Sequence, residues 1–260
     1  MSSLLFSQLR QWPQLQLVRI LSGMPSCCAL CGQTGKRVIC DDCSKHYFAE
    51  CPHRCEQCAN LLPPLNGAGP IRCGNCLKQS RAFDATIVVC DYAAPVDQLI
   101  LALKFGGQLA LAPEFARMLR DTILRKATLA SDQARLAADL PDILMAVPLS
   151  MQRLRHRGFN QAHEIAKPLA RLTGIPLRHD LLLRQRDTLP QSMGLDQEQR
   201  RRNLRQAFAV PPVASEKIRG RHIGVVDDVM TTGETLHALA KTLRRHGARR
   251  ITNFVFARTP

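Results

Sequence analysis

The chain of 260 residues is long enough for two domains, and its 45% hydrophobic content is ordinary for a globular protein with an apolar core. Its 36 Lys and Arg residues outnumber its 21 Asp and Glu residues, and the formal net charge of +15 favours polyanionic, phosphate-bearing partners. Since no apolar run approaches the roughly 20 residues that span a bilayer, we expect no signal peptide and no membrane insertion.

Ten of the eleven cysteines lie between Cys27 and Cys76, and eight of these form four Cys-x-x-Cys pairs. Two such pairs can enclose one tetrahedral Zn²⁺, so we predict two structural zinc ions, whether the pairs combine sequentially or interleave. The pattern, in a long chain without an export signal, favours zinc over disulfides and a reducing cytoplasmic location. The predicted ligands are Cys28, Cys31, Cys40, Cys43, Cys55, Cys58, Cys73 and Cys76.

The remaining cysteines and nearby histidines are assigned simpler roles. Cys90 is expected to be a small buried strand residue, while Cys27 and Cys51 are left without a partner pair. His46 and His53 could replace a thiolate, but four complete pairs favour ordinary surface histidines.

The character of the sequence changes near residue 80, where we expect a boundary between an N-terminal segment with the cysteine module (1–80) and a second domain (81–260). Beyond it, apolar runs typical of buried strands alternate with apolar residues at helical spacing. Strands are expected at 85–92, 143–147, 223–226 and 251–257, and helices at 96–103, at 112–125, between Asn160 and Gly174, and at 236–247. This alternation predicts an α/β fold whose parallel sheet is covered on both faces.

The most informative stretch, 225–236, runs from an apolar strand through two adjacent acids and a hydroxyl-rich turn into a helix. Backbone N–H groups and hydroxyls of such a turn can bind one phosphate at the positive end of the helix, and the acids suit the hydroxyls of a sugar. An ordinary strand-to-helix connection also uses Asp and Thr, but it does not need two acids before Thr-Thr-Gly-x-Thr. The predicted ligand residues are Asp227, Asp228, Thr231, Thr232, Gly233, Glu234 and Thr235.

Several motifs carry a resemblance to a known family. The stretch 225–235 resembles the phosphoribosyl pyrophosphate motif of type I phosphoribosyltransferases, and Leu99-Ile-Leu-Ala-Leu-Lys-Phe-Gly106, Arg155-His-Arg-Gly-Phe-Asn-Gln161 and the cysteine pairs look like the ComF/GntX family. The resemblance covers nearly all of the chain from Cys28 onward. It implies a type I phosphoribosyltransferase fold with a hood, behind a double zinc ribbon, and a link to competence and the use of imported DNA.

The resemblance also implies roles for the acids and the turn. Asp227 and Asp228 would hold the ribose 2′ and 3′ hydroxyls of phosphoribosyl pyrophosphate, which binds with Mg²⁺, and the turn would hold its 5′-phosphate. Phosphoribosyltransferases specific for 6-oxopurines have an acid at the position of Thr231. Its absence here disfavours that class of acceptor but does not exclude catalysis.

A second loop is implied after the strand at 143–147, where Pro148, Leu149 and Ser150 would bind pyrophosphate. Arg153, Arg155 and Arg157 offer forked donors to its oxygens, although clustered arginines would equally suit a solvated basic face or a nucleic-acid patch. The predicted catalytic residues are Asp227, Asp228, Arg153 and Arg157.

The sequence leaves two functions open. The first is a phosphoribosyltransferase with an undetermined acceptor; the alternative is a non-catalytic nucleic-acid-binding or regulatory protein that retains the ligand site. Single-stranded DNA or DNA-uptake proteins are the candidate partners, and an arginine-rich stretch at 183–208 is expected to form a hood or loop near the acceptor.

Overall fold

The computed structural model describes residues 26–49, 53–63, 71–129, 140–185 and 207–260. By their internal contacts the residues divide into two compact units, 1–49 and 50–260. The boundary that the sequence predicts near residue 80 stays a prediction about folding domains, which limited proteolysis would test.

The described residues of the first unit, 26–49, form two short strands and one helix. Strand β1 (Ser26–Cys27) pairs antiparallel with β2 (Thr34–Gly35), and α3 (Asp41–Phe48) follows. Besides cysteines, the buried hydrophobic residues described in this unit are Ile39 and Phe48. So small an apolar core leaves little net stability, and a metal ion held by the cysteines of this unit would add to it.

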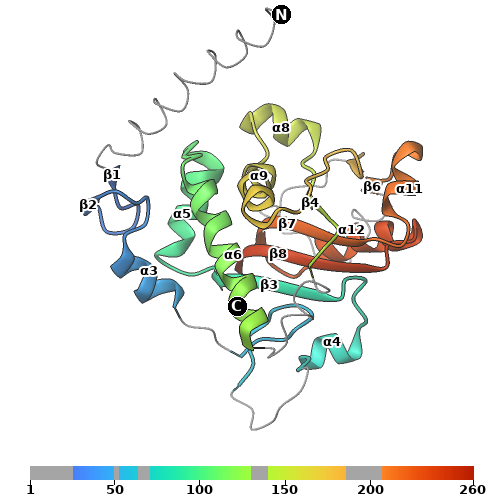
Figure 1. The fold of residues 1–260 in the computed structure, drawn as a ribbon, viewed down its shortest axis with the longest axis horizontal. Coiled ribbons are helices and arrows are strands. Elements are labelled where there is room, and N and C mark those ends of the chain that lie inside the picture. The colour runs from blue at the N-terminus through green and yellow to red at the C-terminus, as the bar shows by residue number, and fades with distance from the viewer. Residues whose placement is uncertain (1–25, 50–52, 64–70, 130–139, 186–206) are drawn as a thin grey trace, which may run out of the picture. The chain divides into compact units, whose positions relative to one another are not determined.

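The second unit is built on a four-stranded sheet in the order β3–β8–β7–β4, in which every neighbouring pair is parallel (Figure 1). The strands are β3 (Ala85–Asp91), β4 (Ile143–Ala146), β7 (His222–Met230) and β8 (Arg250–Arg258). The sequence predicted all four, but it ended the β7 strand at Val226. The strand continues because its backbone pairs with β8 as far as Met230, and this pairing overrides the poor strand propensity of Asp.

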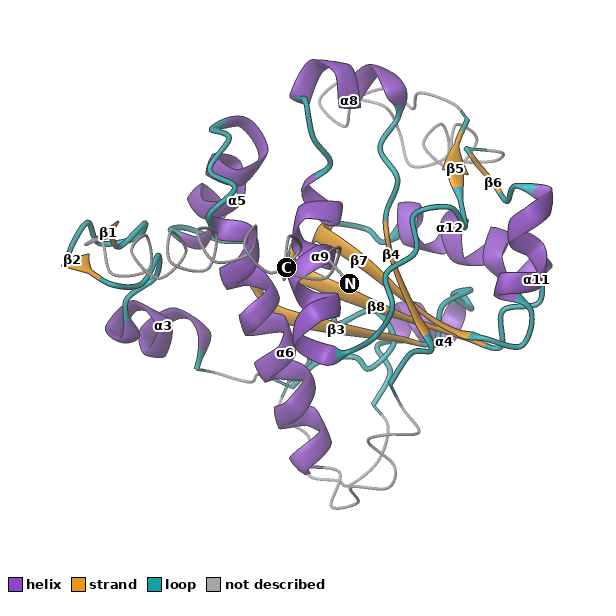
Figure 2. Ribbon diagram, turned by 45° about the horizontal axis from the view of Figure 1, so that its top comes forward, coloured by secondary structure: helices purple, strands orange, loops and turns teal. Residues whose placement is uncertain are grey.

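Helices cover both faces of the sheet, as expected from the alternating pattern. Phe256 of β8 stacks on Phe115 of α6 with ring centroids 3.6 Å apart, while the neighbouring Val255 belongs to the same buried hydrophobic cluster as Leu239 of α12. Because side chains alternate along a strand, α6 and α12 lie on opposite faces. The longer helices are α5 (Val96–Phe105), α6 (Leu111–Leu129), α9 (Gln161–Thr173) and α12 (Glu234–Arg245), and Figure 2 shows α6 and α9 crossing the same face.

Shorter elements complete the described part of this unit. They are α4 (Gly74–Lys78), α8 (Met151–Arg157), the 3₁₀ turn η1 (Pro212–Ala214), α11 (Ser215–Ile218), and the antiparallel pair β5 (Leu183–Arg184) and β6 (Phe208–Ala209). The greater part of the predicted hood stretch, 186–206, lies outside the described residues.

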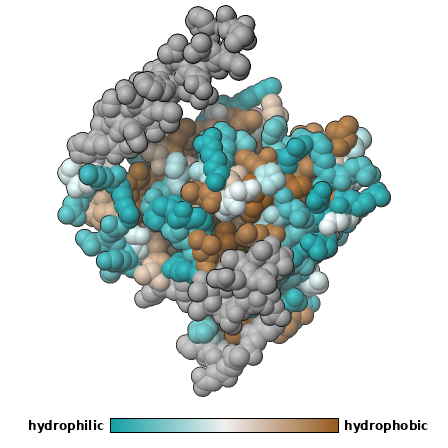
Figure 3. All heavy atoms as spheres, in the orientation of Figure 1, coloured by the Kyte–Doolittle hydropathy of each residue, from teal (hydrophilic) through white to brown (hydrophobic). Residues whose placement is uncertain are grey.

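The helices bury one side and expose the other. Ala162, Ile165 and Leu169 of α9 are buried at helical spacing, which leaves polar residues on its outer side. In the space-filling view, hydrophilic side chains make up most of the described surface of one face, and hydrophobic ones show mainly near its centre (Figure 3). None of the helices in the described ranges is both long and apolar enough to cross a membrane.

Candidate functional site

The two acids lie where one strand of the sheet outruns its neighbour. Strand β4 ends at Ala146, which pairs with Val226, and β7 continues beyond this point. Asp227 and Asp228 therefore lie past the carboxyl end of β4, at the edge where α/β proteins bind ligands. Asp228 is only 3% exposed and Asp227 is half-buried.

A lysine from a distant helix forms an ion pair with one of the two acids. Lys104, near the end of α5, places its Nζ 2.8 Å from Oδ2 of Asp228. The Asp227 carboxylate accepts a hydrogen bond from the backbone N–H of Asp228 at 2.9 Å. Burial, and then the charge of Asp228, raise the pKa of Asp227 well above its usual range. Sequence reasoning gave Lys104 no role, although it lies within the motif 99–106.

The turn after β7 requires a glycine. Gly233 has φ of 76°, and a Cβ on it would lie 2.4 Å from Cε of Met230. Glycine enters this left-handed region without the steric cost of other residues. Thr232 is exposed, Thr231 and Thr235 are half-buried, and α12 begins directly after the turn. We name the segment 231–235 the phosphate loop. Its amides and hydroxyls can therefore bind an anion at a helix N-terminus.

The one acid in the phosphate loop is neutralised by another residue that the sequence did not reveal. Nη1 of Arg81 lies 2.8 Å from Oε1 of Glu234, and Nη2 donates to the carbonyl of Thr232 at 3.3 Å. Both side chains of the pair are largely buried, at 14% and 9% exposure. The backbone amide of Glu234, rather than its carboxylate, is thus the group suited to a phosphate.

The segment after β4 turns directly into a helix. Pro148 and Leu149 are half-buried, and the buried Ser150 caps α8 by accepting from the backbone N–H of Arg153 at 3.4 Å. Asn160 caps α9 as expected and also donates to the carbonyl of Val147, the residue that follows β4, at 3.0 Å. These contacts fix the backbone of the segment, whose role toward pyrophosphate stays a prediction.

Arginines of α8 approach the acid pair. Arg153 and Arg157 are one helical turn apart and share a side of α8, while Arg155 is exposed. Burial lowers the pKa of Arg157, the charge of Asp228 raises it and that of Arg153 lowers it again, so these charges lie near one another. The guanidinium of Arg157 also lies 5.1 Å from the ring centroid of Phe105, beside Lys104.

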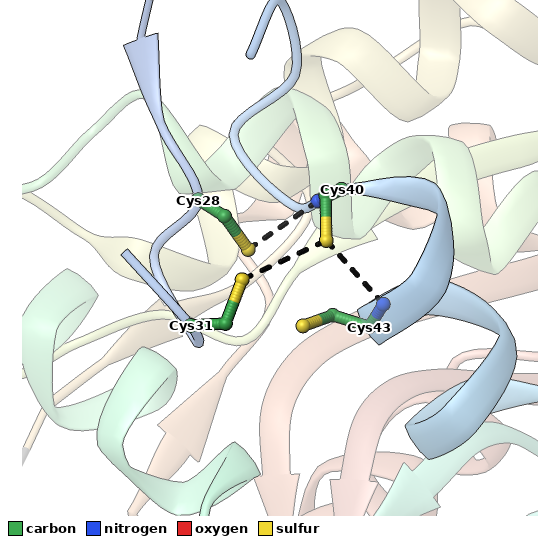
Figure 4. A group of neighbouring side chains, drawn as sticks. All are labelled: Cys28, Cys31, Cys40 and Cys43. Carbon is green, nitrogen blue, oxygen red and sulfur yellow. Dashed lines mark hydrogen bonds between the residues drawn. The ribbon is translucent and has the colours of Figure 1, made fainter. Parts of the chain in front are cut away.

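The first cysteine cluster comprises Cys28, Cys31, Cys40 and Cys43, with all four Sγ atoms within 4.8 Å of one another. Figure 4 shows the sulfur atoms turned toward a common centre, two of them from the start of α3. Sγ of Cys31 and of Cys40 are 3.8 Å apart, which matches a tetrahedral site whose bonds of about 2.3 Å place sulfurs about 3.8 Å from each other. The thiols fit a zinc ion.

The second cysteine cluster comprises Cys55, Cys58, Cys73 and Cys76, whose Sγ atoms also all lie within 4.8 Å of one another. All four residues are buried, and Sγ of Cys58 lies 3.5 Å from Sγ of Cys73. The pairs therefore combine in sequence order, which settles an alternative that spacing alone left open. Each cluster is closed by four thiols, as in a structural rather than a catalytic zinc site.

The remaining cysteines and histidines lie outside these clusters. Cys90 is a buried residue of β3 whose Sγ lies 3.4 Å from the Phe256 carbonyl, as expected for a packing role. Cys27, His46 and His53 are exposed, and Cys51 lies outside the described residues. Of the arginine-rich stretch, Arg184 packs its guanidinium 5.6 Å from the ring centroid of Phe208. Arg186, Arg200, Arg201, Arg202 and Arg205 fall in the undescribed range.

The chain is similar to a known protein family and to several known proteins. The phosphoribosyl transferase domain family matches residues 157–260. The DNA utilization protein YhgH of Escherichia coli K12 is 33% identical over 91% of this chain and 98% of its own length. Competence protein F of Haemophilus influenzae is 32% identical over 86% and 91%, respectively. Competence protein ComFC of Bacillus subtilis is 25% identical over 70% of this chain and 65% of the relative.

Proposed function

Because the chain belongs to the ComF/GntX family of competence and DNA-utilisation proteins and contains a phosphoribosyl transferase domain, we propose that it binds phosphoribosyl pyrophosphate with Mg²⁺ at the carboxyl end of β7. One observation carries the proposal. Two adjacent acids lie past the end of β4, and the phosphate loop with its left-handed Gly233 follows them directly. Groups suited to a sugar and groups suited to a phosphate thus lie side by side.

Each part of the ligand has a matching group in the chain. Asp227 and Asp228 accept hydrogen bonds from the ribose hydroxyls, and the phosphate loop binds the 5′-phosphate. The pyrophosphate lies toward Arg153 and Arg157, with the backbone of 148–150 beside it. Magnesium, when bound with the ligand, offsets the negative charge of the pyrophosphate.

A nucleophile that attacks C1 of the ribose displaces pyrophosphate, and the arginines stabilise the charge on the departing group. The chain would contribute position and electrostatics rather than a covalent intermediate. Acceptor-dependent release of pyrophosphate on adding candidate bases or amines supports this enzyme. Ligand binding without release under any acceptor supports a regulatory binding site instead.

Zinc is the proposed structural ion of both cysteine clusters, since the sulfur positions fit tetrahedral thiolate coordination. Eight thiolates in such clusters need a reducing compartment, so we place the protein in the cytoplasm. Metal analysis of the purified protein tests the ions directly, with two zinc ions per chain as the expected result.

Titration of the protein with phosphoribosyl pyrophosphate and Mg²⁺ tests the central proposal. Replacing Asp227 and Asp228 together by Asn should abolish magnesium-dependent binding and leave zinc content unchanged. The matched control replaces Asp41 and Asp42 by Asn, which are adjacent exposed acids in the first unit, and should bind as the wild type does. Unchanged affinity in the first variant would show that the site lies elsewhere.

Single-stranded DNA is the second proposed partner, favoured by the names of the relatives and by the net charge of +15. Binding carried by phosphate contacts should weaken steeply as salt rises. Capture of a labelled oligonucleotide at low and high salt measures this. A wild-type protein that ignores DNA at low salt removes this partner and leaves the phosphoribosyl pyrophosphate proposal intact.

A further inference from the structure

The segment that follows the second cysteine cluster in the chain contacts the phosphate loop. Arg81 follows Cys76 closely in the chain, and its guanidinium contacts both the Glu234 carboxylate at 2.8 Å and the Thr232 carbonyl at 3.3 Å. The next residue, Ala82, donates its backbone N–H to Nδ1 of His237 in the first turn of α12 at 3.0 Å. Three contacts from two consecutive residues thus reach the loop and the helix behind it.

A second arginine reaches the start of the same loop. Arg258 of β8 donates through Nε to the carbonyl of Cys58 at 3.2 Å and through Nη1 to the carbonyl of Met230 at 3.4 Å. The Met230 carbonyl also accepts from the backbone N–H of Thr259 at 3.0 Å. One guanidinium therefore joins the backbone of the second cluster to the residue from which the phosphate loop begins.

The second cluster is itself part of the core beneath the loop. Its four cysteines belong to one buried group with Phe83 and with Leu236 of α12. The carbonyl of Glu56 accepts from the backbone N–H of Thr86 on the edge strand β3 at 2.9 Å, and that of Gln57 accepts from the Thr86 hydroxyl at 2.6 Å. A change in the geometry of the cluster would be transmitted to the sheet edge and to the residues that hold the loop.

We propose that Arg81 is a positioning residue and that the second cysteine cluster, through Arg81 and Arg258, holds the phosphate loop in its binding conformation. A metal ion in this cluster then raises the affinity of the loop for phosphorylated ligands, because it increases the fraction of molecules whose loop is competent to bind. The identity of the ligand rests on the proposed function, whereas the ordering of the loop does not.

The two cysteine clusters provide a matched pair of variants. Cys73→Ser opens the second cluster and Cys31→Ser opens the first, which belongs to the other compact unit. Hydrogen exchange of the His237 amide, which donates to the Gly233 carbonyl at 2.8 Å, reports whether the first turn of α12 is formed. We expect each variant to lose one zinc ion, and only Cys73→Ser to exchange this amide about tenfold faster. Equal exchange in the two variants overturns the proposal.

Since Cys73→Ser could fail to fold, Arg81→Ala tests the same link with both clusters intact. Its control is Arg178→Ala, which breaks the pair with Asp180 at 2.9 Å, a contact that involves neither the phosphate loop nor α12. Arg81→Ala should speed exchange at His237 and weaken magnesium-dependent binding of phosphoribosyl pyrophosphate about tenfold, as expected if a tenth of loops stay competent. Arg81→Lys, which keeps the charge, should recover part of both losses, and Arg178→Ala should change neither.

The two readouts separate this inference from the proposed function. If the wild type binds no phosphoribosyl pyrophosphate, the proposed ligand is wrong, and the exchange comparison still decides whether Arg81 orders the loop. If the wild type binds the ligand and Arg81→Ala matches it in both exchange and affinity, the positioning role is overturned and the ligand site stands.

Discussion

Gly233→Ala changes the phosphate loop at its left-handed residue. With φ of 76° the residue lies in the left-handed region, where an L-residue costs about 1–2 kcal/mol. The added Cβ would lie 2.4 Å from the flexible end of Met230, which can move aside at smaller cost. We therefore expect the free energy of unfolding to fall by about 1–2 kcal/mol, and the loop to relieve its strain by turning N–H groups away from the phosphate.

Gly224→Ala, in the middle of β7, serves as the control. A Cβ there would lie 2.6 Å from Cδ2 of Leu144 and 2.7 Å from Cε2 of Phe254, within the packed core and away from the loop. Overpacking of this kind costs about 1–3 kcal/mol. For a unit of this size, each kcal/mol lowers Tm by roughly 2–4 °C, so the two variants should be destabilised to similar extents.

Thermal unfolding and titration with phosphoribosyl pyrophosphate and Mg²⁺ distinguish the two variants. Only Gly233→Ala should lose affinity, by about tenfold or more, which corresponds to about 1.4 kcal/mol. Wild-type affinity in Gly233→Ala would refute the assignment of the phosphate to this turn. So would an equal loss in Gly224→Ala, since affinity would then follow stability alone.

Further variants test single contacts around the site. Lys104→Met should lower the free energy of unfolding by about 2 kcal/mol, because the buried Asp228 loses its cation; the partial exposure of the lysine keeps the loss this small. Chemical denaturation measures this loss, with Lys104→Arg as the control that keeps the charge. Equal free energies of unfolding in the two variants would contradict the ion pair. The raised pKa of Asp227 favours the folded state at low pH, and this contribution is lost as pH rises through the raised value. Asp227→Asn should therefore gain stability relative to the wild type as pH rises above the usual range of Asp, whereas parallel stability curves would count against the shift. Asn160→Ala should cost about 1–2 kcal/mol in thermal unfolding, since both a helix cap and a hydrogen bond to Val147 are lost, and an unchanged Tm would remove that role.

The elements of the sheet could be predicted because their signals are local. Runs such as 85–91 and 143–146 are apolar and bounded by turn residues, and the caps Asn160 and Gly174 mark both ends of α9. The end of β7 was placed too early, at Val226. Two acids look like the end of a strand when only propensity is considered, whereas pairing with β8 continues through them.

The long-range partners could not be predicted from the sequence. Lys104 pairs with Asp228, and Arg81 pairs with Glu234, which lies 153 residues further along the chain. No spacing rule links such distant positions. The cysteine spacing gave eight ligands but not their combination, because sequential and interleaved sites share the same pattern. The two ion pairs are seen only in the folded chain. There the end of α5, with Lys104, and the segment after the second cysteine cluster, with Arg81, both lie near the carboxyl end of β7.

A crystal structure of the protein with phosphoribosyl pyrophosphate and Mg²⁺ is the most direct test of the central claim. We predict that the 5′-phosphate lies within hydrogen-bond distance of the N–H groups of 231–235, with the ribose hydroxyls against Asp227 and Asp228. A ligand bound elsewhere, with the turn before α12 left empty, would contradict the account.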